Sequence, residues 1–256
     1  MPEFSIHVTA DETGIGRSDI CTAMLESLQG AHPNDHPIFL SGYEVLCEAG
    51  ARGARILEIC GGGGTQAAAL ARVCPLATII GLDLYIPTTP VSVEAAKTLS
   101  NLEYVAGNAF DLSSYPENSF DVVFGQAALH HLSHDLRGLS RQISRILKPG
   151  GKLVFIFEPM GHNWLVAAIR AVRMARHEFG DESNLYLSQF RFFNEDFTHC
   201  EVRVFNLFGY FTKGFPRRLK WITKMCHWFD HMLFQRSERC RRWAANANLI
   251  FTKSTT

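Results

Sequence analysis

Four consecutive glycines follow a short apolar run in the segment Arg55 to Thr65, which reads Arg-Ile-Leu-Glu-Ile-Cys-Gly-Gly-Gly-Gly-Thr. Glycine adopts backbone conformations that other residues avoid, so such a run is expected where a chain turns sharply against a ligand. The residues from Gln66 to Val73 are rich in strong helix formers, and Thr65 is predicted to cap that helix. A strand, a glycine turn and a helix N-terminus together form a site for an anion.

Predicted strands and helices alternate from this turn onward. Apolar runs predict strands at residues 55–59, 78–82, 102–106, 121–124 and 152–157, and helical patterns lie between them at 66–74, 92–99 and 136–147. This alternation, with strands that are apolar on both faces, is typical of a parallel sheet covered by helices on both sides. The predicted fold class is therefore α/β.

The glycine turn alone is compatible with more than one cofactor. Gly62, Gly64 and Ala67 fit the dinucleotide fingerprint G-x-G-x-x-A, and Asp83 follows about 20 residues later. On this motif a nicotinamide-dependent oxidoreductase is one alternative. It leaves no place for the step Asn108-Ala109 or for the strand from Phe120 to Phe124.

Taken in order, the motifs resemble those of the class I methyltransferases that use S-adenosylmethionine (SAM), of the type found in ubiquinone and menaquinone biosynthesis. The segment from Glu58 resembles their motif (D/E)-x-G-x-G-x-G, with Cys60 where the first glycine normally stands. Asn108-Ala109, the strand from Phe120 and the turn at residues 147–151 resemble the later motifs. The resemblance covers residues 55–159. It implies a Rossmann-like, mostly parallel seven-stranded sheet closed by an antiparallel C-terminal hairpin, which we assign to residues 202–208 and 248–252.

The resemblance also implies a set of residues that bind SAM. Asp83 would accept hydrogen bonds from the ribose hydroxyls, and Glu58 would lie near the amino group of SAM. Asn108 would contact the adenine, although it could equally be a turn residue after Gly107. The full predicted set is Glu58, Cys60, Gly61, Gly62, Gly64, Asp83, Leu84, Asn108, Ala109 and Gln126.

Two residues are candidates for catalysis. His131 follows the fourth predicted strand, and histidine is a common general base near neutral pH. It could instead merely open the next helix. Glu158 ends the fifth strand and is expected to face the crevice where open α/β sheets bind ligands. Met160, His162 and Tyr43 are weaker candidates, because such residues are more often packing residues.

Composition narrows the functional classes. The chain has 256 residues, of which 46% are hydrophobic and 20% charged, as in ordinary globular proteins. A formal net charge of zero argues against a nucleic-acid partner. The seven cysteines are scattered without zinc-like spacing, so no metal site is expected. The N-terminus resembles no signal sequence and no apolar run would span a bilayer, so we expect a cytoplasmic location.

Two regions lie outside the expected core. Residues 1–50 are predicted to form a helical cap, with helices at 19–28 and 42–49, that folds over the cofactor cleft or only covers a sheet edge. Residues 51–256 are expected to form the catalytic domain, with helical insertions at about 161–198 and 214–243.

The second insertion is predicted to form an amphipathic helix. Its apolar residues recur at helical spacing: Trp221, Ile222, Met225, Trp228, Phe229, Met232 and Leu233. Eight Lys or Arg between residues 217 and 242 accompany only Asp230 and Glu238. Two interpretations stay open: a helix packed on the sheet, or a lid that encloses an apolar acceptor and contacts an anionic membrane through its basic rim.

The sequence therefore predicts a SAM-dependent methyltransferase that acts at an O, N or C atom of a small organic molecule, in the manner of natural-product enzymes. A lipid or quinone acceptor at a membrane surface is an alternative. A third is a protein of this fold that binds SAM without catalysis, because fold does not fix function. Oligomeric state cannot be read from the sequence.

Overall fold

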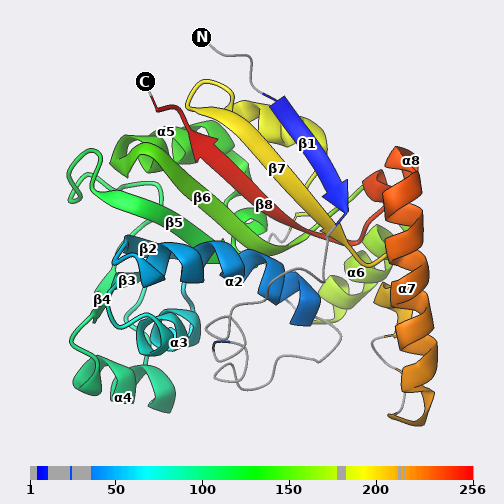
Figure 1. Ribbon diagram of the computed structural model, residues 1–256, viewed down its shortest axis with the longest axis horizontal. Helices are drawn as coiled ribbons and strands as arrows, with labels where there is room; N and C mark the ends of the chain where they lie inside the picture. Colours follow the sequence, from blue (N-terminus) through cyan, green and yellow to red (C-terminus); the bar gives the residue numbers. More distant parts are fainter. Residues whose placement is uncertain are drawn as a thin grey trace.

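An eight-stranded sheet forms the centre of the protein, with helices on both faces (Figure 1). The computed structural model describes residues 5–10, 24, 36–177, 183–212, 215 and 217–255. The strand order is β1-β7-β8-β6-β5-β2-β3-β4. All neighbouring strands are parallel except β8, which runs antiparallel to both β6 and β7. This confirms the predicted α/β class.

The elements have the following bounds. The strands are β1 (Ser5–Ala10), β2 (Arg55–Ile59), β3 (Thr78–Asp83), β4 (Leu102–Ala106), β5 (Phe120–Gln126), β6 (Leu147–Pro159), β7 (Phe197–Phe205) and β8 (Asn246–Lys253). The helices are α2 (His36–Ala51), α3 (Thr65–Val73), α4 (Pro90–Thr98), α5 (Leu136–Ile146), α6 (Trp164–His177), α7 (Lys220–Arg236) and α8 (Glu238–Arg242). Short 3₁₀ turns are η2 (Leu129–His131), η3 (Ser133–Asp135), η4 (Leu187–Phe193), η5 (Gly209–Thr212) and η6 (Arg217–Leu219).

The N-terminal segment contributes a strand that was not predicted. Ser5–Ala10 pairs in parallel with β7, from Ser5 opposite His199 to Ala10 opposite Val204, and extends the expected seven-stranded sheet by one strand. These residues, which lie in the segment 1–50 predicted as a helical cap, thus form a strand instead. Ile6 and Val8 alternate with polar residues and pack against the core, which is the two-residue period of a strand. Helix α2 contains the predicted helix at 42–49, whereas the predicted helix at 19–28 lies, apart from Met24, outside the described residues.

The sheet separates two apolar layers. In β2, Ile56 packs with the buried residues of α2 and α3, and Leu57 packs on the opposite face with those of α5. Helix α2 is fixed over the antiparallel part of the sheet by the buried Asn248, whose amide donates to the Ile38 carbonyl (2.6 Å) and accepts from the Phe157 N–H (2.9 Å). Buried polar groups need such partners, so Asn248 determines where α2 lies.

The C-terminal hairpin is shifted relative to its prediction. Strand β7 ends at Phe205 instead of Phe208, because the N–H groups of Leu207 and Phe208 donate to the carboxylate of Asp230 in α7 rather than to a neighbouring strand. A backbone N–H that is committed to a side chain cannot continue a ladder.

The carboxyl ends of β2, β3, β4 and β5 meet at one edge of the sheet, where the glycine turn joins β2 to α3. Gly64 is the N-cap of α3, so the prediction that Thr65 caps this helix is wrong. The turn places Gly64 at φ +71°, a left-handed conformation that disfavours residues with a Cβ atom. Its carbonyl accepts from the Tyr104 hydroxyl of β4 (2.5 Å), which ties the turn to the sheet.

Two glycines of this turn allow a matched test. A Cβ atom at Gly64 would lie 2.7 Å from the Tyr104 ring and 2.8 Å from Pro87, whereas one at Gly62, also left-handed at φ +50°, would meet no atom within 4 Å. Gly62→Ala should lower the free energy of unfolding by about 1 kcal/mol through backbone strain, and Gly64→Ala by about 2–4 kcal/mol, because a clash is added. Urea denaturation measures both values. Equal losses would contradict the packing around Gly64.

Candidate active site

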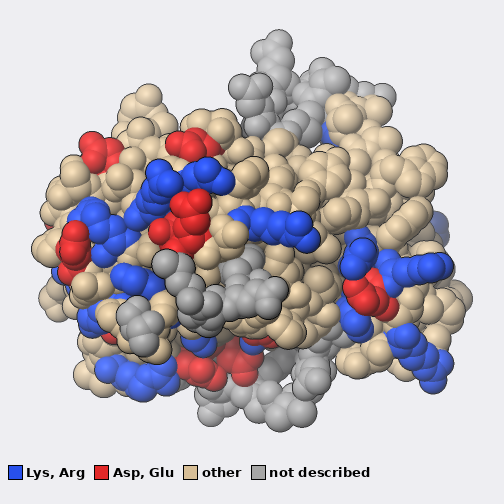
Figure 2. Space-filling model, turned by 90° about the horizontal axis from the view of Figure 1, so that it is seen from above, with Lys and Arg blue, Asp and Glu red and all other residues tan. Residues whose placement is uncertain are grey.

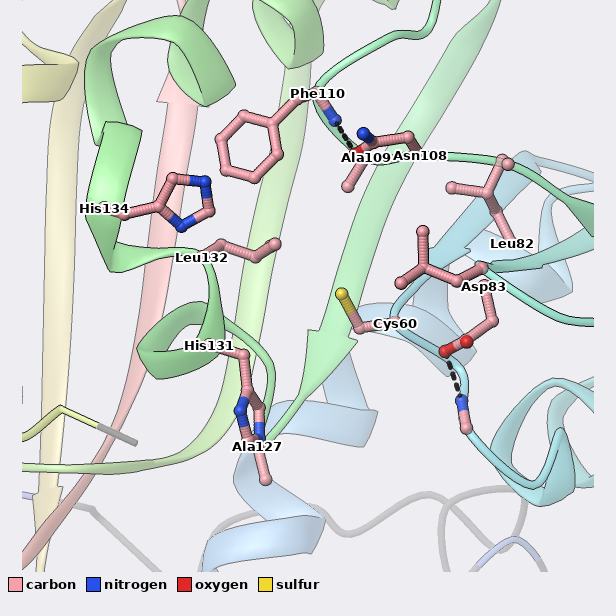
Figure 3. A pocket seen from close by; sticks show the side chains of 13 residues that line it. Cys60, Leu82, Asp83, Asn108, Ala109, Phe110, Ala127, His131, Leu132 and His134 are labelled. Atoms are coloured by element: carbon pink, nitrogen blue, oxygen red, sulfur yellow. Dashed lines mark hydrogen bonds between the residues drawn. The ribbon is translucent and has the colours of Figure 1, made fainter. Parts of the chain in front are cut away.

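A cavity of about 530 Å³ opens at the carboxyl ends of these strands (Figure 3). Its described lining comes from the glycine turn, from the ends of β3, β4 and β5, and from the turns η2 and η3. The lining residues are Cys60, Gly62, Leu82, Asp83, Leu84, Gly107, Asn108, Ala109, Phe110, Ala127, His131, Leu132 and His134. Seven predicted site residues are among them: Cys60, Gly62, Asp83, Leu84, Asn108, Ala109 and His131.

Asp83 ends β3 and lies at one side of the cavity (Figure 3). Its Oδ2 accepts the Gly62 N–H at 2.8 Å, so the carboxylate and the glycine turn are held together. Thr89, not Asp83, caps α4. Asp83 is therefore available to a ligand in the cavity.

Asn108 makes a turn interaction and also lines the cavity. Its Oδ1 accepts the Phe110 N–H at 2.9 Å, which is a turn interaction, and the same side chain lines the cavity (Figure 3). Because Oδ1 is already engaged, the amide NH₂ is the group that Asn108 can offer to a ligand.

Glu58 lies beneath the turn instead of in the cavity lining. It is only 1% exposed, and its Oε2 accepts the Ala67 N–H of α3 at 3.2 Å. A Cβ atom at Gly61 would lie 2.9 Å from this oxygen, so Gly61 allows the turn to pass closely over the carboxylate. Burial raises the pKa of Glu58 to about 8, and the charge of Asp83 adds to this shift, although the Ala67 hydrogen bond opposes it.

Cys60 occupies the position of the first motif glycine and adopts a left-handed conformation, φ +54°. Its thiol points into the cavity between Asp83 and His131 (Figure 3). Burial, followed by the charges of Asp83, Glu158 and Glu58, raises its pKa to about 12. The thiol therefore stays protonated at neutral pH and is not a nucleophile.

The Gln126 side chain is bound outside the described lining of the cavity. Tyr43 of α2 donates a close hydrogen bond to its Oε1, and Tyr43 is fully buried. Gln126 thus joins α2 to the end of β5, and the neighbouring Ala127, at φ +50°, lines the cavity in its place.

Glu158 does not face the crevice, which corrects that expectation. It is fully buried beneath the loop after β5. Its Oε1 accepts from the N–H groups of Ala128 (2.7 Å) and Leu129 (2.9 Å), and its Oε2 lies 2.9 Å from Nδ1 of His130. A carboxylate with all these partners fixes the shape of the loop rather than accepting a proton from a substrate.

His131 extends from that loop to the side of the cavity that faces Asp83 (Figure 3). Its ring lies against the ring of His130, with centroids 4.1 Å apart. Glu158 therefore holds His130, and His130 packs against His131. This arrangement brings together the two predicted catalytic residues, but only His131 lines the cavity.

Six lining residues are outside the predicted set: Leu82, Gly107, Phe110, Ala127, Leu132 and His134. The rings of Phe110 and His134 lie 4.6 Å apart and form one wall. Phe110 directly follows the Asn108-Ala109 motif, and this adjacency was a signal for it. His134 lies in η3, and its pairing with Phe110 depends on a contact between two loops that have no pattern of their own.

Comparisons with known proteins agree with this geometry. Residues 57–155 match the model of a family described as "Methyltransferase domain". An uncharacterized methyltransferase of Synechocystis is 33% identical over 128 residues, which are 49% of this chain and 57% of that protein. The demethylmenaquinone methyltransferase of Staphylococcus carnosus is 34% identical over 104 residues, which are 40% of this chain and 42% of that protein. The chain thus spans about half the length of the curated relatives it matches.

A solved structure has the same fold. Phosphoethanolamine N-methyltransferase 2 of Haemonchus contortus, in complex with SAM, superposes with a TM-score of 0.55 at 18% identity, over 84% of this chain and 53% of that protein. Residues 57–155 form a class I methyltransferase domain. The domain match agrees with the family predicted from the sequence.

Two kinds of feature are absent from the described residues. They contain no group of three or more His, Cys, Asp or Glu side chains arranged to hold a metal ion. Within the same residues, no helix has the length and apolar character needed to cross a membrane.

The buried Glu58 predicts a pH dependence of stability. Its folded pKa of about 8 exceeds the ordinary value of 4.5, so between these pH values the folded state keeps a proton that the unfolded state has released. Stability from this group is complete below about pH 4.5 and falls as the pH rises to about 8. Glu58→Gln keeps an oxygen for the Ala67 N–H and should remove this loss.

Denaturation of both proteins across this pH range tests the assignment. As the pH rises, the free energy of unfolding of the variant should increase relative to that of the wild type. A constant difference between them would show that Glu58 is not kept neutral by burial.

Proposed function

We propose that this protein transfers the methyl group of SAM to a small organic acceptor bound beside His131. The observation that carries the proposal is the pairing of carboxylates with the glycine turn: Asp83 with the Gly62 N–H and Glu58 with the Ala67 N–H. A nicotinamide dinucleotide would present its pyrophosphate to such N–H groups. Here both N–H groups already have a side-chain acceptor, and the charge of Asp83 would repel a pyrophosphate, whereas the cationic sulfonium and amino group of SAM suit this site.

The residues of the cavity fit SAM. The described lining contains the Asp83 carboxylate and no Lys or Arg, so its charge favours a cationic ligand. Asp83 would hold the ribose hydroxyls, and the Asn108 amide would donate to the adenine between Leu84 and Phe110. Cys60 and Ala127 would contact the methionine end. Bound SAM supplies a methyl group activated by a sulfonium; this chain supplies alignment and a site from which water is partly excluded.

His131 is our candidate for the base that removes a proton from the acceptor. It lines the cavity on the side opposite Asp83, and its ring packs against His130, which Glu158 holds at 2.9 Å. In this proposal Glu158 is a positioning residue, because it acts on His131 through His130. The proton of the acceptor would pass to an imidazole nitrogen of His131 as the methyl group is transferred.

A relative with a named substrate points to one class of acceptor. The named relative from Staphylococcus methylates a demethylmenaquinone, so a quinone or phenol is a second candidate within the same activity. A protein that binds SAM without catalysis is the alternative from another class. Incubation with SAM carrying a labelled methyl group, with panels of phenols, quinols and amines, separates these possibilities. Binding of SAM without labelled product from any acceptor class would favour the non-catalytic alternative.

Asp83→Ala should weaken binding of S-adenosylhomocysteine roughly tenfold or more, because each lost hydrogen bond to a charged acceptor is worth roughly 1.5–3 kcal/mol. Isothermal titration calorimetry measures the change. Asp111→Ala is the matched control, because Asp111 is a fully exposed carboxylate in the loop after β4 and is not among the lining residues. Unchanged affinity in Asp83→Ala would refute the ribose assignment.

His131→Ala should lower kcat about 100-fold with little change in SAM affinity, and the dependence of kcat on pH should lose its acidic limb. His134→Ala removes a second imidazole from the same cavity and should change cofactor affinity more than kcat, because His134 packs on Phe110. If both variants lose kcat equally, or His131→Ala retains it, His131 is not the base.

A further inference from the structure

Helix α7 exposes the side that the sequence identifies as apolar. Four large residues on that side are strongly exposed: Trp221 (61%), Met225 (52%), Trp228 (63%) and Phe229 (43%). We call these four residues the tryptophan face. They recur at helical spacing, and none is among the described residues that line the cavity. Of the two interpretations left open by the sequence, a lid over the described cavity is not formed by these residues in the observed arrangement.

The orientation of α7 is fixed by the opposite side of the helix. Thr223, Asp230 and Phe234 are at most 5% exposed. The Asp230 carboxylate accepts the N–H groups of Leu207 (2.9 Å) and Gly209 (2.9 Å), in addition to that of Phe208 (2.8 Å). Turning the tryptophan face inward would break these three bonds and expose Phe234, so the face stays outside.

The apolar surface continues beyond the helix. Phe208, which is 44% exposed, packs against Phe229 with ring centroids 6.1 Å apart. The neighbouring segment adds Phe211 and Phe215, exposed by 38% and 44%. Contiguous exposed apolar surface of this kind marks an interaction site more often than isolated residues do.

Basic side chains surround this surface. Lys224 and Arg236 of α7 are exposed, as are Arg218, Arg239 and Arg242 at its two ends. The one acidic residue of α7, Asp230, is buried, and the exposed Glu238 is paired with Arg242 at 2.7 Å. Figure 2 shows Lys and Arg side chains gathered at the right end of the molecule, where Figure 1 has α7 and α8.

We propose that the tryptophan face docks on an anionic lipid bilayer. Tryptophan is suited to the boundary between water and hydrocarbon, and a rim of Lys and Arg matches the phosphates of anionic lipids. A helix of 17 residues is about 25 Å long, enough to lie along the bilayer surface. A second copy fits less well, because a symmetric contact would bring the two basic rims together. This inference does not depend on the identity of the methyl acceptor.

The first test uses the wild-type chain. Co-sedimentation with vesicles of phosphatidylcholine, with or without phosphatidylserine, should show binding that requires phosphatidylserine and weakens as salt increases. Brominated lipids in the same vesicles should quench the tryptophan fluorescence. Absence of both binding and quenching would overturn the proposal without any variant.

Matched variants locate the contact. Trp221→Ser with Trp228→Ser should weaken vesicle binding roughly tenfold or more through lost apolar burial, whereas Leu76→Ser, at a site 73% exposed between α3 and β3, should not. Replacing both Lys224 and Arg236 by Glu should remove the preference for phosphatidylserine. Each replacement should weaken binding to vesicles that contain this lipid roughly fivefold or more. The control for this charge reversal is the double variant Arg72→Glu with Lys97→Glu, in α3 and α4.

Unfolding midpoints and S-adenosylhomocysteine affinity should stay unchanged in these variants, because the replaced side chains are exposed. Vesicle binding that survives the double Trp replacement would overturn the proposal. So would a wild-type dimer in analytical ultracentrifugation that the same replacement converts to a monomer, because the face would then join two copies.

Discussion

Four carboxyl groups of this protein accept backbone N–H groups that no helix or strand satisfies. Glu58 accepts from Ala67 at the start of α3, and Asp83 accepts from Gly62 in the glycine turn. Glu158 accepts from the loop after β5, and Asp230 from the segment after β7. A buried N–H without a partner costs about 1–3 kcal/mol, so each carboxylate stabilises one irregular segment that a parallel sheet leaves at its carboxyl edge.

Acidic residues that are buried and bound to backbone N–H groups cannot contact a ligand, so only the others remain accessible from the cavity. Glu58 and Glu158 are buried and bound to backbone, so they shape the turn and the loop from below. Asp83 lines the cavity, as do Asn108 and His131. The charge of Asp83 at the cavity is compatible with a cationic cofactor, and together with burial, which is the larger cause, it raises the pKa of Cys60 to about 12. The same groups that complete the fold therefore set the charge of the site.

Asp230 has a corresponding effect at the other end of the sheet. By binding the segment from Leu207 to Gly209, it fixes the rotation of α7 and removes the one acidic side chain of that helix from the surface. The result is an exposed face of Trp, Met and Phe with a basic rim. The cavity and the proposed membrane contact would thus both depend on a carboxylate that binds irregular backbone.

The sequence by itself determined the α/β class, the glycine turn and the position of Asp83, because these follow from local period and from glycine conformation. Seven of the predicted site residues line the cavity for the same reason: the ends of parallel strands meet at one edge. Only the tertiary structure decided that Glu58 and Glu158 are buried, that Ser5–Ala10 joins the sheet, and that the apolar side of α7 faces outward. Periodicity identifies which residues share a face, but the direction of that face, and the N–H group a carboxylate reaches, depend on contacts between segments far apart in the chain.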